Sequence, residues 1–123
     1  MELSNEDVAR AISSHHFEAA IPRLAENVVW TLVGEEPLRG KDGVLALLEA
    51  TEAELAATTS EFERFRSIPA GDTVVIDSVA HYVDATGDAS TVASCDIYTF
   101  EEGLITEIRS YNIELPPASE ALV

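Results

Sequence analysis

Apolar residues at helical spacing predict a helix near the start of the chain. Val8 and Ile12 are four residues apart, which places them on one helix face, with Ala11 beside them. Ser4 is a suitable N-cap, because its hydroxyl can accept a hydrogen bond from a free amide of the first turn. Polar residues 13–16 predict a break after this helix. A second short helix is expected next, with a kink or a late start at Pro22, which cannot donate a backbone hydrogen bond. Its apolar positions are Phe17, Ala20, Ile21 and Leu24.

A strand, a loop and a longer helix are predicted to follow. Residues 28–33 are mostly β-branched, aromatic or aliphatic, which favours a strand. Residues 34–40 contain one proline and two glycines and predict a loop. We expect a helix to begin at Asp42 or a neighbouring residue. Its apolar stripe at helical spacing is Val44, Leu47, Leu48, Thr51 and Leu55.

The second half of the chain has the pattern of strands separated by short turns. The turns are predicted from the Pro and Gly at 69–72, from Gly87 and from Gly103. Helices followed by an antiparallel meander indicate an α+β fold, with the helices packed on one face of a curved sheet. No linker or repeat divides the chain, so we expect a single domain over 1–123. The predicted strands are 61–68, 73–84, 89–100 and 104–115, the last stopped by Pro116 and Pro117.

Alternation along the last two strands predicts which polar side chains share a face. Asp96 shares a face with Ser94 and Tyr98, and Ser110 shares a face with Asn112. A strongly bent sheet with helices on its concave side forms a cone, whose interior can be part core and part cavity. Both faces of these strands mix apolar and polar residues, so alternation alone does not decide which face is interior.

The charge of the chain excludes several classes of partner. Seven Lys and Arg against 23 Asp and Glu give a net charge of −16, which argues against binding to nucleic acid or to an anionic membrane. No apolar run approaches the ~20 residues of a membrane-spanning helix, and the acidic N-terminus does not resemble a signal peptide. The one cysteine, Cys95, cannot form an internal disulfide. We therefore expect a reduced, cytoplasmic protein.

The turn at 100–105 consists of an aromatic residue, two acids, Gly, Leu and Ile, and Tyr111 follows six residues later. With this turn as its most specific segment, the chain resembles, in the order of its elements and in several short segments, the SnoaL-like branch of the nuclear transport factor two-like superfamily. The resemblance covers nearly the whole chain. It implies a cone-shaped α+β barrel, the cystatin-like roll, with helices on the concave face, a hydrophobic cavity and dimerisation through the outer sheet face. The other segments that carry it are residues 28–30, 37–40, 96–99 and 109–110.

The superfamily includes steroid isomerases, polyketide cyclases, epoxide hydrolases and binding-only domains, so the fold does not settle the function. Asp96 falls where the resemblance to ketosteroid isomerases implies a neutral carboxyl group that donates a hydrogen bond to an oxyanion. An apolar site would favour that neutral form. The general base of that group would fall near Leu32, and its oxyanion-binding Tyr near Val8. Two of three roles are therefore missing, and steroid isomerisation is not expected.

The resemblance to cyclases and to limonene-type epoxide hydrolases is also incomplete at the catalytic positions. Both would place a carboxylate at Ser110, which is a poor general base. The hydrolases also need an Arg and a second carboxylate, where the chain offers His81 and Asp84. A third alternative, an enzyme with its base at His81 or Glu107, stays open.

No metal or cofactor is expected. His15 and His16 fall in what is expected to be an exposed break, and adjacent histidines rarely point at one ion. Cys95 is expected to be an inert, buried thiol rather than a nucleophile. No phosphate-binding or dinucleotide-binding glycine pattern is present.

The main hypothesis is a small SnoaL-like domain, a homodimer, that binds an apolar or aromatic small molecule. Asp96 is its candidate catalytic residue, for acid or base chemistry on a carbonyl or ring compound as an isomerase, cyclase or hydrolase. The alternative is a non-catalytic dimerisation or regulatory module. The candidate lining residues are Trp30, Leu32, Tyr98, Ser110, Asn112 and His81.

Overall fold

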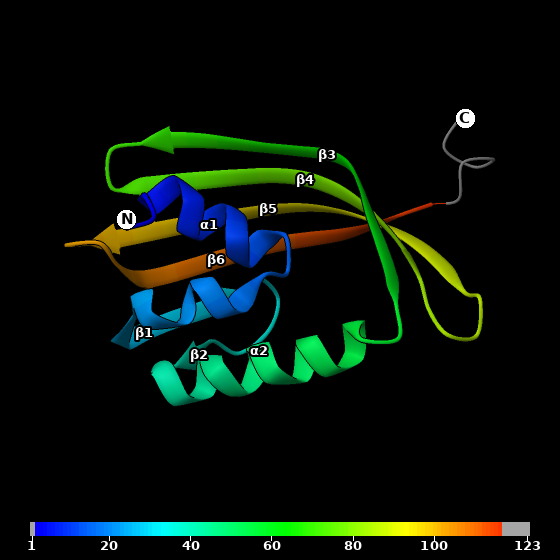
Figure 1. The fold of residues 1–123 in the computed structure, drawn as a ribbon, viewed down its shortest axis with the longest axis horizontal. Coiled ribbons are helices and arrows are strands. Elements are labelled where there is room, and N and C mark those ends of the chain that lie inside the picture. The colour runs from blue at the N-terminus through cyan, green and yellow to red at the C-terminus, as the bar shows by residue number, and fades with distance from the viewer. Residues whose placement is uncertain (1, 117–123) are drawn as a thin grey trace.

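Helices on one side and a long twisted sheet on the other make up the fold (Figure 1). The structure is a computed structural model that describes residues 2–116. The expected α+β architecture, with the helices first, is confirmed. In chain order the described elements are α1 (Asn5–Ser13), the 3-10 turns η1 (Phe17–Ala19) and η2 (Ile21–Arg23), β1 (Leu24–Leu32), β2 (Leu38–Arg39), α2 (Lys41–Leu55), β3 (Thr59–Ala70), β4 (Thr73–Val83), β5 (Ala89–Glu101) and β6 (Leu104–Leu115).

Helix α1 begins where the sequence predicts it. The Ser4 Oγ accepts a hydrogen bond from the Asp7 amide at 3.0 Å, and the Asp7 carboxylate accepts one from the Ser4 amide at 3.2 Å. This capping box satisfies two donors, the free Asp7 amide of the first turn and the N-cap amide of Ser4. Val8 and Ile12 lie on the buried face of the helix, as their spacing predicts. The helix ends at Ser13, at the predicted break.

The predicted second helix is wrong. Residues 17–23 form two single 3-10 turns, and Leu24 already belongs to β1, four residues before the predicted strand. Pro22 lies in the first part of η2 and supplies no backbone N–H, so the chain makes one turn there and then extends. The predicted loop at 34–40 also contains the two residues of β2, which pair with Val29 and Trp30.

The sheet has the order β2-β1-β6-β5-β4-β3. Strands β3 to β6 form the predicted meander, and each pair of neighbours is antiparallel. One pairing differs from the expected antiparallel sheet: β1 runs parallel to β6, with Trp30 opposite Ile108. These strands are far apart in sequence and share no turn, so local turn signals carry no information about their direction. Strand β6 ends at Leu115, before Pro116, while Pro117 lies outside the described residues.

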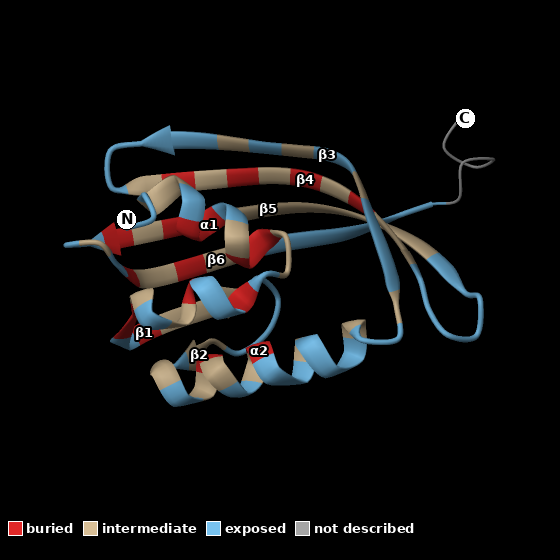
Figure 2. Ribbon diagram, viewed as in Figure 1, coloured by how far each residue is buried: buried red, intermediate tan, exposed pale blue. Residues whose placement is uncertain are grey.

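The core lies under α1, between that helix and the inner face of β4, β5 and β6 (Figure 2). Buried and partly exposed residues alternate along β4 from Val74 to Ala80, because successive side chains point to opposite faces. Tyr98 and Ile108 are fully buried at the centre of this layer. The far part of the sheet, with the β4–β5 turn, extends beyond α1 (Figure 1). That uncovered part faces the second half of α2.

Replacing the helix cap tests this account of α1. Ser4→Ala removes the acceptor of the Asp7 amide and should lower the free energy of unfolding by about 1 kcal/mol. The measurement is urea unfolding followed by circular dichroism. Ser60→Ala, an exposed position in β3 without a described side-chain hydrogen bond, is the matched control and should change stability by less than about 0.5 kcal/mol. Equal effects of both substitutions would contradict the capping role.

Candidate functional site

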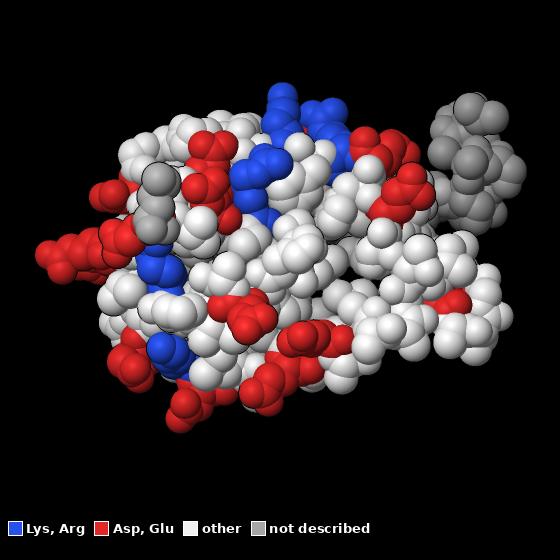
Figure 3. All heavy atoms as spheres, in the orientation of Figure 1, with Lys and Arg blue, Asp and Glu red and all other residues white. Residues whose placement is uncertain are grey.

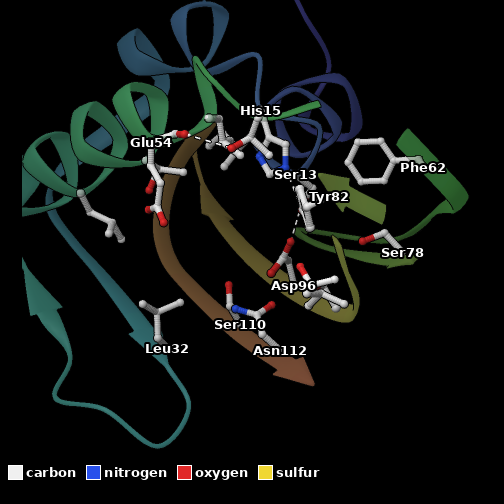
Figure 4. Close-up of a pocket in the computed structure, with 18 of the residues that line it drawn as sticks. Ser13, His15, Leu32, Glu54, Phe62, Ser78, Tyr82, Asp96, Ser110 and Asn112 are labelled. Atoms are coloured by element: carbon white, nitrogen blue, oxygen red, sulfur yellow. Dashed lines mark hydrogen bonds between the residues drawn. The ribbon is translucent and has the colours of Figure 1, made fainter. Parts of the chain in front are cut away.

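A cavity of about 730 Å³ opens between the second half of α2 and the sheet beyond α1. Side chains from the end of α1, from α2 and from five strands, β1 and β3 to β6, line it (Figure 4). The apolar part of the lining includes Leu47 and Leu55 of α2, Leu32 of β1 and Phe62 of β3. The polar part gathers around Asp96 on β5, whose side chain points into the cavity (Figure 4).

Asp96 receives a hydrogen bond from the end of α1. The Ser13 hydroxyl donates to Asp96 Oδ2 at 2.7 Å and also lies 2.8 Å from the Tyr98 hydroxyl. Tyr98 is fully buried, and a neutral buried phenol donates its proton where it can. Since Ser13 donates its own proton to the carboxylate, its oxygen accepts from Tyr98. The chain of hydrogen bonds therefore runs from Tyr98 through Ser13 to Asp96.

A second chain reaches Asp96 from the other side. The Trp30 Nε1 donates to the Ser110 Oγ at 3.0 Å. An indole N–H can only donate, so the Ser110 proton must point elsewhere. Ser110 stands directly opposite Asp96 in the β5–β6 register, and its hydroxyl hydrogen bond lowers the pKa of Asp96. Trp30, Ser110, Asp96, Ser13 and Tyr98 are called the Asp96 network below.

Burial is the dominant influence on the Asp96 carboxyl. Loss of water raises its pKa, because the charged form is less stable away from solvent. Hydrogen bonds from Ser110 and Ser13 oppose this shift, as does the nearby His15, but the net pKa remains above the ordinary value for Asp. The Asp96 charge in turn helps burial to raise the pKa of Tyr98. Tyr98 therefore stays a neutral donor.

His15 lies at the cavity, where the sequence suggested an exposed break. Its backbone has a φ of 71°, just past the end of α1, and its Nε2 lies 3.1 Å from the Tyr82 hydroxyl. The ring packs against Phe17 and Phe62. Burial lowers the pKa of His15 more than the Asp96 charge raises it, so the neutral imidazole is favoured near neutral pH. His16 is exposed.

Most of the site residues expected from the sequence come together. Asp96, Trp30, Leu32, Tyr98, Ser110 and Asn112 all line the cavity. The residues that sequence reasoning missed come from other elements and include Ser13, His15, Glu54, Phe62, Ser78 and Tyr82. Alternation along β4 could have placed Ser78 and Tyr82 on the interior face. Both are an even number of residues from the apolar, buried Val74 and Ile76, so all four side chains point to the same side of the sheet.

His81 is a correction to the expected lining. It lies on the outer face of β4, where Nδ1 is 2.8 Å from Thr91 Oγ1 and Nε2 is 2.8 Å from Glu63 Oε1. Its neighbours Ala80 and Tyr82 take the inner face, and alternation then directs His81 outward. His81 therefore does not line the cavity.

Cys95 also lies on the outer face, and it is partly exposed rather than fully buried. Burial and the carboxylates of Asp96 and Asp77 raise the pKa of its thiol, which opposes the reactive thiolate. Within residues 2–116, no group of three or more His, Cys, Asp or Glu side chains is arranged to hold a metal ion. No helix in the same range is long and apolar enough to cross a membrane.

The sequence matches the family model of the SnoaL-like domain over residues 6–108. The chain belongs to the SnoaL-like domain family. The match begins at the second residue of α1, spans α2 and ends within β6, so it includes all of the Asp96 network except Ser110. No curated protein matches the chain.

Solved structures share this SnoaL-like fold. An NTF2-like protein of unknown function from Cytophaga hutchinsonii is 28% identical, with a TM-score of 0.79 over 92% of this chain and 99% of that one. An LEH-like epoxide hydrolase from M. tuberculosis is 18% identical, with a TM-score of 0.67 over 89% and 82%. A putative SnoaL-like polyketide cyclase from Mesorhizobium loti is 17% identical, with a TM-score of 0.62 over 87% and 94%. At 17% and 18% identity the last two show the fold alone.

The raised pKa of Asp96 predicts how stability changes with pH. A raised pKa means that the folded state binds the proton more tightly than the unfolded chain does. The wild type therefore loses stability relative to Asp96→Asn as pH rises from about 3.9, the ordinary Asp value, through the raised pKa. Above that range the difference is constant. Unfolding in urea at a series of pH values measures it.

Asp84→Asn is the matched control, because hydrogen bonds from Thr86 and nearby amides lower the pKa of Asp84. There the dependence has the opposite sign: the wild type gains stability relative to Asp84→Asn as pH rises towards the ordinary value. A stability difference for Asp96→Asn that does not change with pH would contradict the buried-carboxyl account.

Proposed function

We propose that this SnoaL-like domain binds a small apolar or aromatic-ring molecule in its cavity, with Asp96 as the main polar contact. The cavity itself carries the proposal. Its volume, about 730 Å³, falls within the ~300–1,000 Å³ of typical ligand sites. If the interior of the domain served only as a packed core, side chains would fill this space, because protein interiors are close-packed.

The composition of the lining supports the same function. Small-molecule sites combine a largely apolar wall with a few convergent polar groups that fix orientation. Here α2 and β3 contribute an apolar wall that includes Leu47, Leu55 and Phe62, while the Asp96 network supplies polar atoms opposite. The side chains of the network are also hydrogen-bonded to one another. Every buried side-chain nitrogen or oxygen in the described residues has a hydrogen-bond partner, so the site is preorganised.

The proposal extends to acid or base chemistry by Asp96 on a carbonyl or hydroxyl compound. A carboxyl group with a raised pKa holds and releases a proton closer to neutral pH than an ordinary Asp. Such perturbed groups in cavities are common at catalytic sites. Neighbours named as an epoxide hydrolase and a putative polyketide cyclase have the same fold, which is compatible with this chemistry without specifying the reaction.

We also propose that the protein acts in the cytoplasm. Cys95, the single cysteine, is free and partly exposed. A free thiol persists in a reducing compartment.

Filling the cavity tests the binding function. Leu47→Trp places an indole among the lining residues and should weaken ligand binding at least about tenfold, because the ligand and the indole need the same space. Ala46→Trp, one residue away on the exposed face of α2, adds the same side chain outside the cavity and should leave binding unchanged. A screen of apolar ring compounds by thermal shift, then NMR titration, supplies the ligands. Equal affinity in both variants would contradict the cavity as the binding site.

A second candidate function is a dimerisation module, favoured by the outer face of the sheet. Tyr111 and Ile113 of β6 are 39% and 63% exposed there. In the register they stand opposite Cys95 and Ala93, next to Val79 of β4. We propose that a second copy of the chain covers this face. The net charge of −16 opposes association, so the contact must be mainly apolar.

A charge placed on the outer face tests the homodimer. The wild type should sediment as a dimer, and Ile113→Glu should sediment as a monomer, because a buried, unpaired carboxylate at the contact is costly. Leu3→Glu is the control, since Leu3 is 40% exposed but lies before α1, away from the sheet face. Analytical ultracentrifugation over a concentration series measures both. A monomeric wild type would contradict the dimer and leave the cavity function unaffected.

A further inference from the structure

All the carboxylates in the cavity lining lack a basic partner there. The charged lining residues are Glu54 of α2, Asp84 and Asp88 near the β4–β5 turn, and Asp96 at the polar end. None of the lining residues is a Lys or an Arg. Acidic side chains also outnumber basic ones on the face of the molecule that carries the helices (Figure 3). An anionic ligand would therefore meet repulsion at the opening and at the polar end of the cavity.

Asp96 is built as an acceptor. Both hydrogen-bond chains of the network are directed towards it, because Trp30 can only donate and buried Tyr98 has Ser13 as its described partner. Donors on two sides favour a carboxylate over a neutral acid. A neutral donor at this position, as the resemblance implied, would have to compete with those incoming protons.

The carboxylate has no basic counter-charge within the cavity. Partly buried carboxylates are normally paired with a cation. His15 is the one titratable base in the lining; it is held by Tyr82 and favoured as the neutral imidazole. The position that a counter-ion would occupy is thus open to a ligand.

We propose that the ligand is an apolar amine, whose protonated nitrogen donates a hydrogen bond to Asp96 while its hydrocarbon body lies against the apolar wall. This inference rests on the proposed function of the cavity. Aromatic rings in the lining, including Trp30, Phe62 and Tyr82, are also compatible with a cation, because an aromatic face attracts positive charge. The acidic opening formed by Glu54, Asp84 and Asp88 attracts the same charge over a longer range.

Three matched probes test the charge preference: cyclohexylmethylamine, cyclohexylmethanol and cyclohexanecarboxylate. They share one ring and differ in the polar group. Trp30 is the only tryptophan of the chain and lines the cavity, so its fluorescence reports binding of these non-absorbing compounds. At pH 7 we expect the amine to bind about tenfold more tightly than the alcohol, and the carboxylate to bind most weakly, because a hydrogen bond to a charged group is the stronger one.

Two variants separate Asp96 from the overall negative charge. Asp96→Asn should bring the affinity for the amine to within about threefold of that for the alcohol, while alcohol binding persists and shows an intact cavity. Glu61→Gln removes one charge from an exposed position on β3 that pairs with outward-facing His81, and should keep the tenfold preference. The wild-type ranking tests the inference even if Asp96→Asn fails to fold.

The outcomes distinguish this inference from the proposed function. If the alcohol binds as tightly as the amine, or the carboxylate binds best, the amine inference fails and the cavity function stands. If Asp96→Asn keeps the full preference for the amine, overall charge explains it and the inference also fails. If none of the three probes changes Trp30 fluorescence at millimolar concentration, the proposed function itself fails.

Discussion

One serine hydroxyl at the end of α1 connects the helix to the sheet and organises the cavity. Ser13 Oγ contacts both Asp96 Oδ2 and the Tyr98 hydroxyl, and through them it joins α1 to the middle of β5. Tyr98 can be fully buried because this contact satisfies its hydroxyl. The same contact holds the Asp96 carboxyl at the boundary between the core and the cavity. The position of α1, the packing of the core and the polarity of the site therefore depend on one another.

A carboxylate in this place is costly for folding, and this cost is one of the observations behind the proposed function. Burial raises the pKa of Asp96 even though Ser110 and Ser13 both donate to it. A fully structural role would be served by a neutral side chain of the same shape, without that penalty. Side chains that make the fold less stable than an alternative residue would are typical of functional sites. Solved structures with this fold are named as an epoxide hydrolase and as a putative polyketide cyclase. The fold alone therefore does not specify a function, and the proposal rests on the local arrangement around Asp96.

The sequence predicted elements with strong periodicity and missed those that depend on distant contacts. Helix α1 and the meander followed from apolar spacing and glycine turns. The β1–β6 pairing did not, because parallel partners share no local turn. For the site, alternation placed Asp96 with Tyr98 and Ser110 with Asn112, but the interior face is set by where α1 and α2 pack. His15 was missed because its left-handed backbone, which turns the ring towards Tyr82, is unusual for a non-glycine residue.

The central claim is that the Asp96 carboxyl projects into a space largely shielded from water. The direct measurement is the titration of its side-chain carbon by NMR, with Asp96 assigned by comparison with Asp96→Asn. The account predicts a midpoint above the ordinary Asp pKa of about 3.9, because burial outweighs the hydrogen bonds from Ser13 and Ser110. A midpoint at or below that value would show that burial does not dominate the Asp96 carboxyl, and would contradict the account.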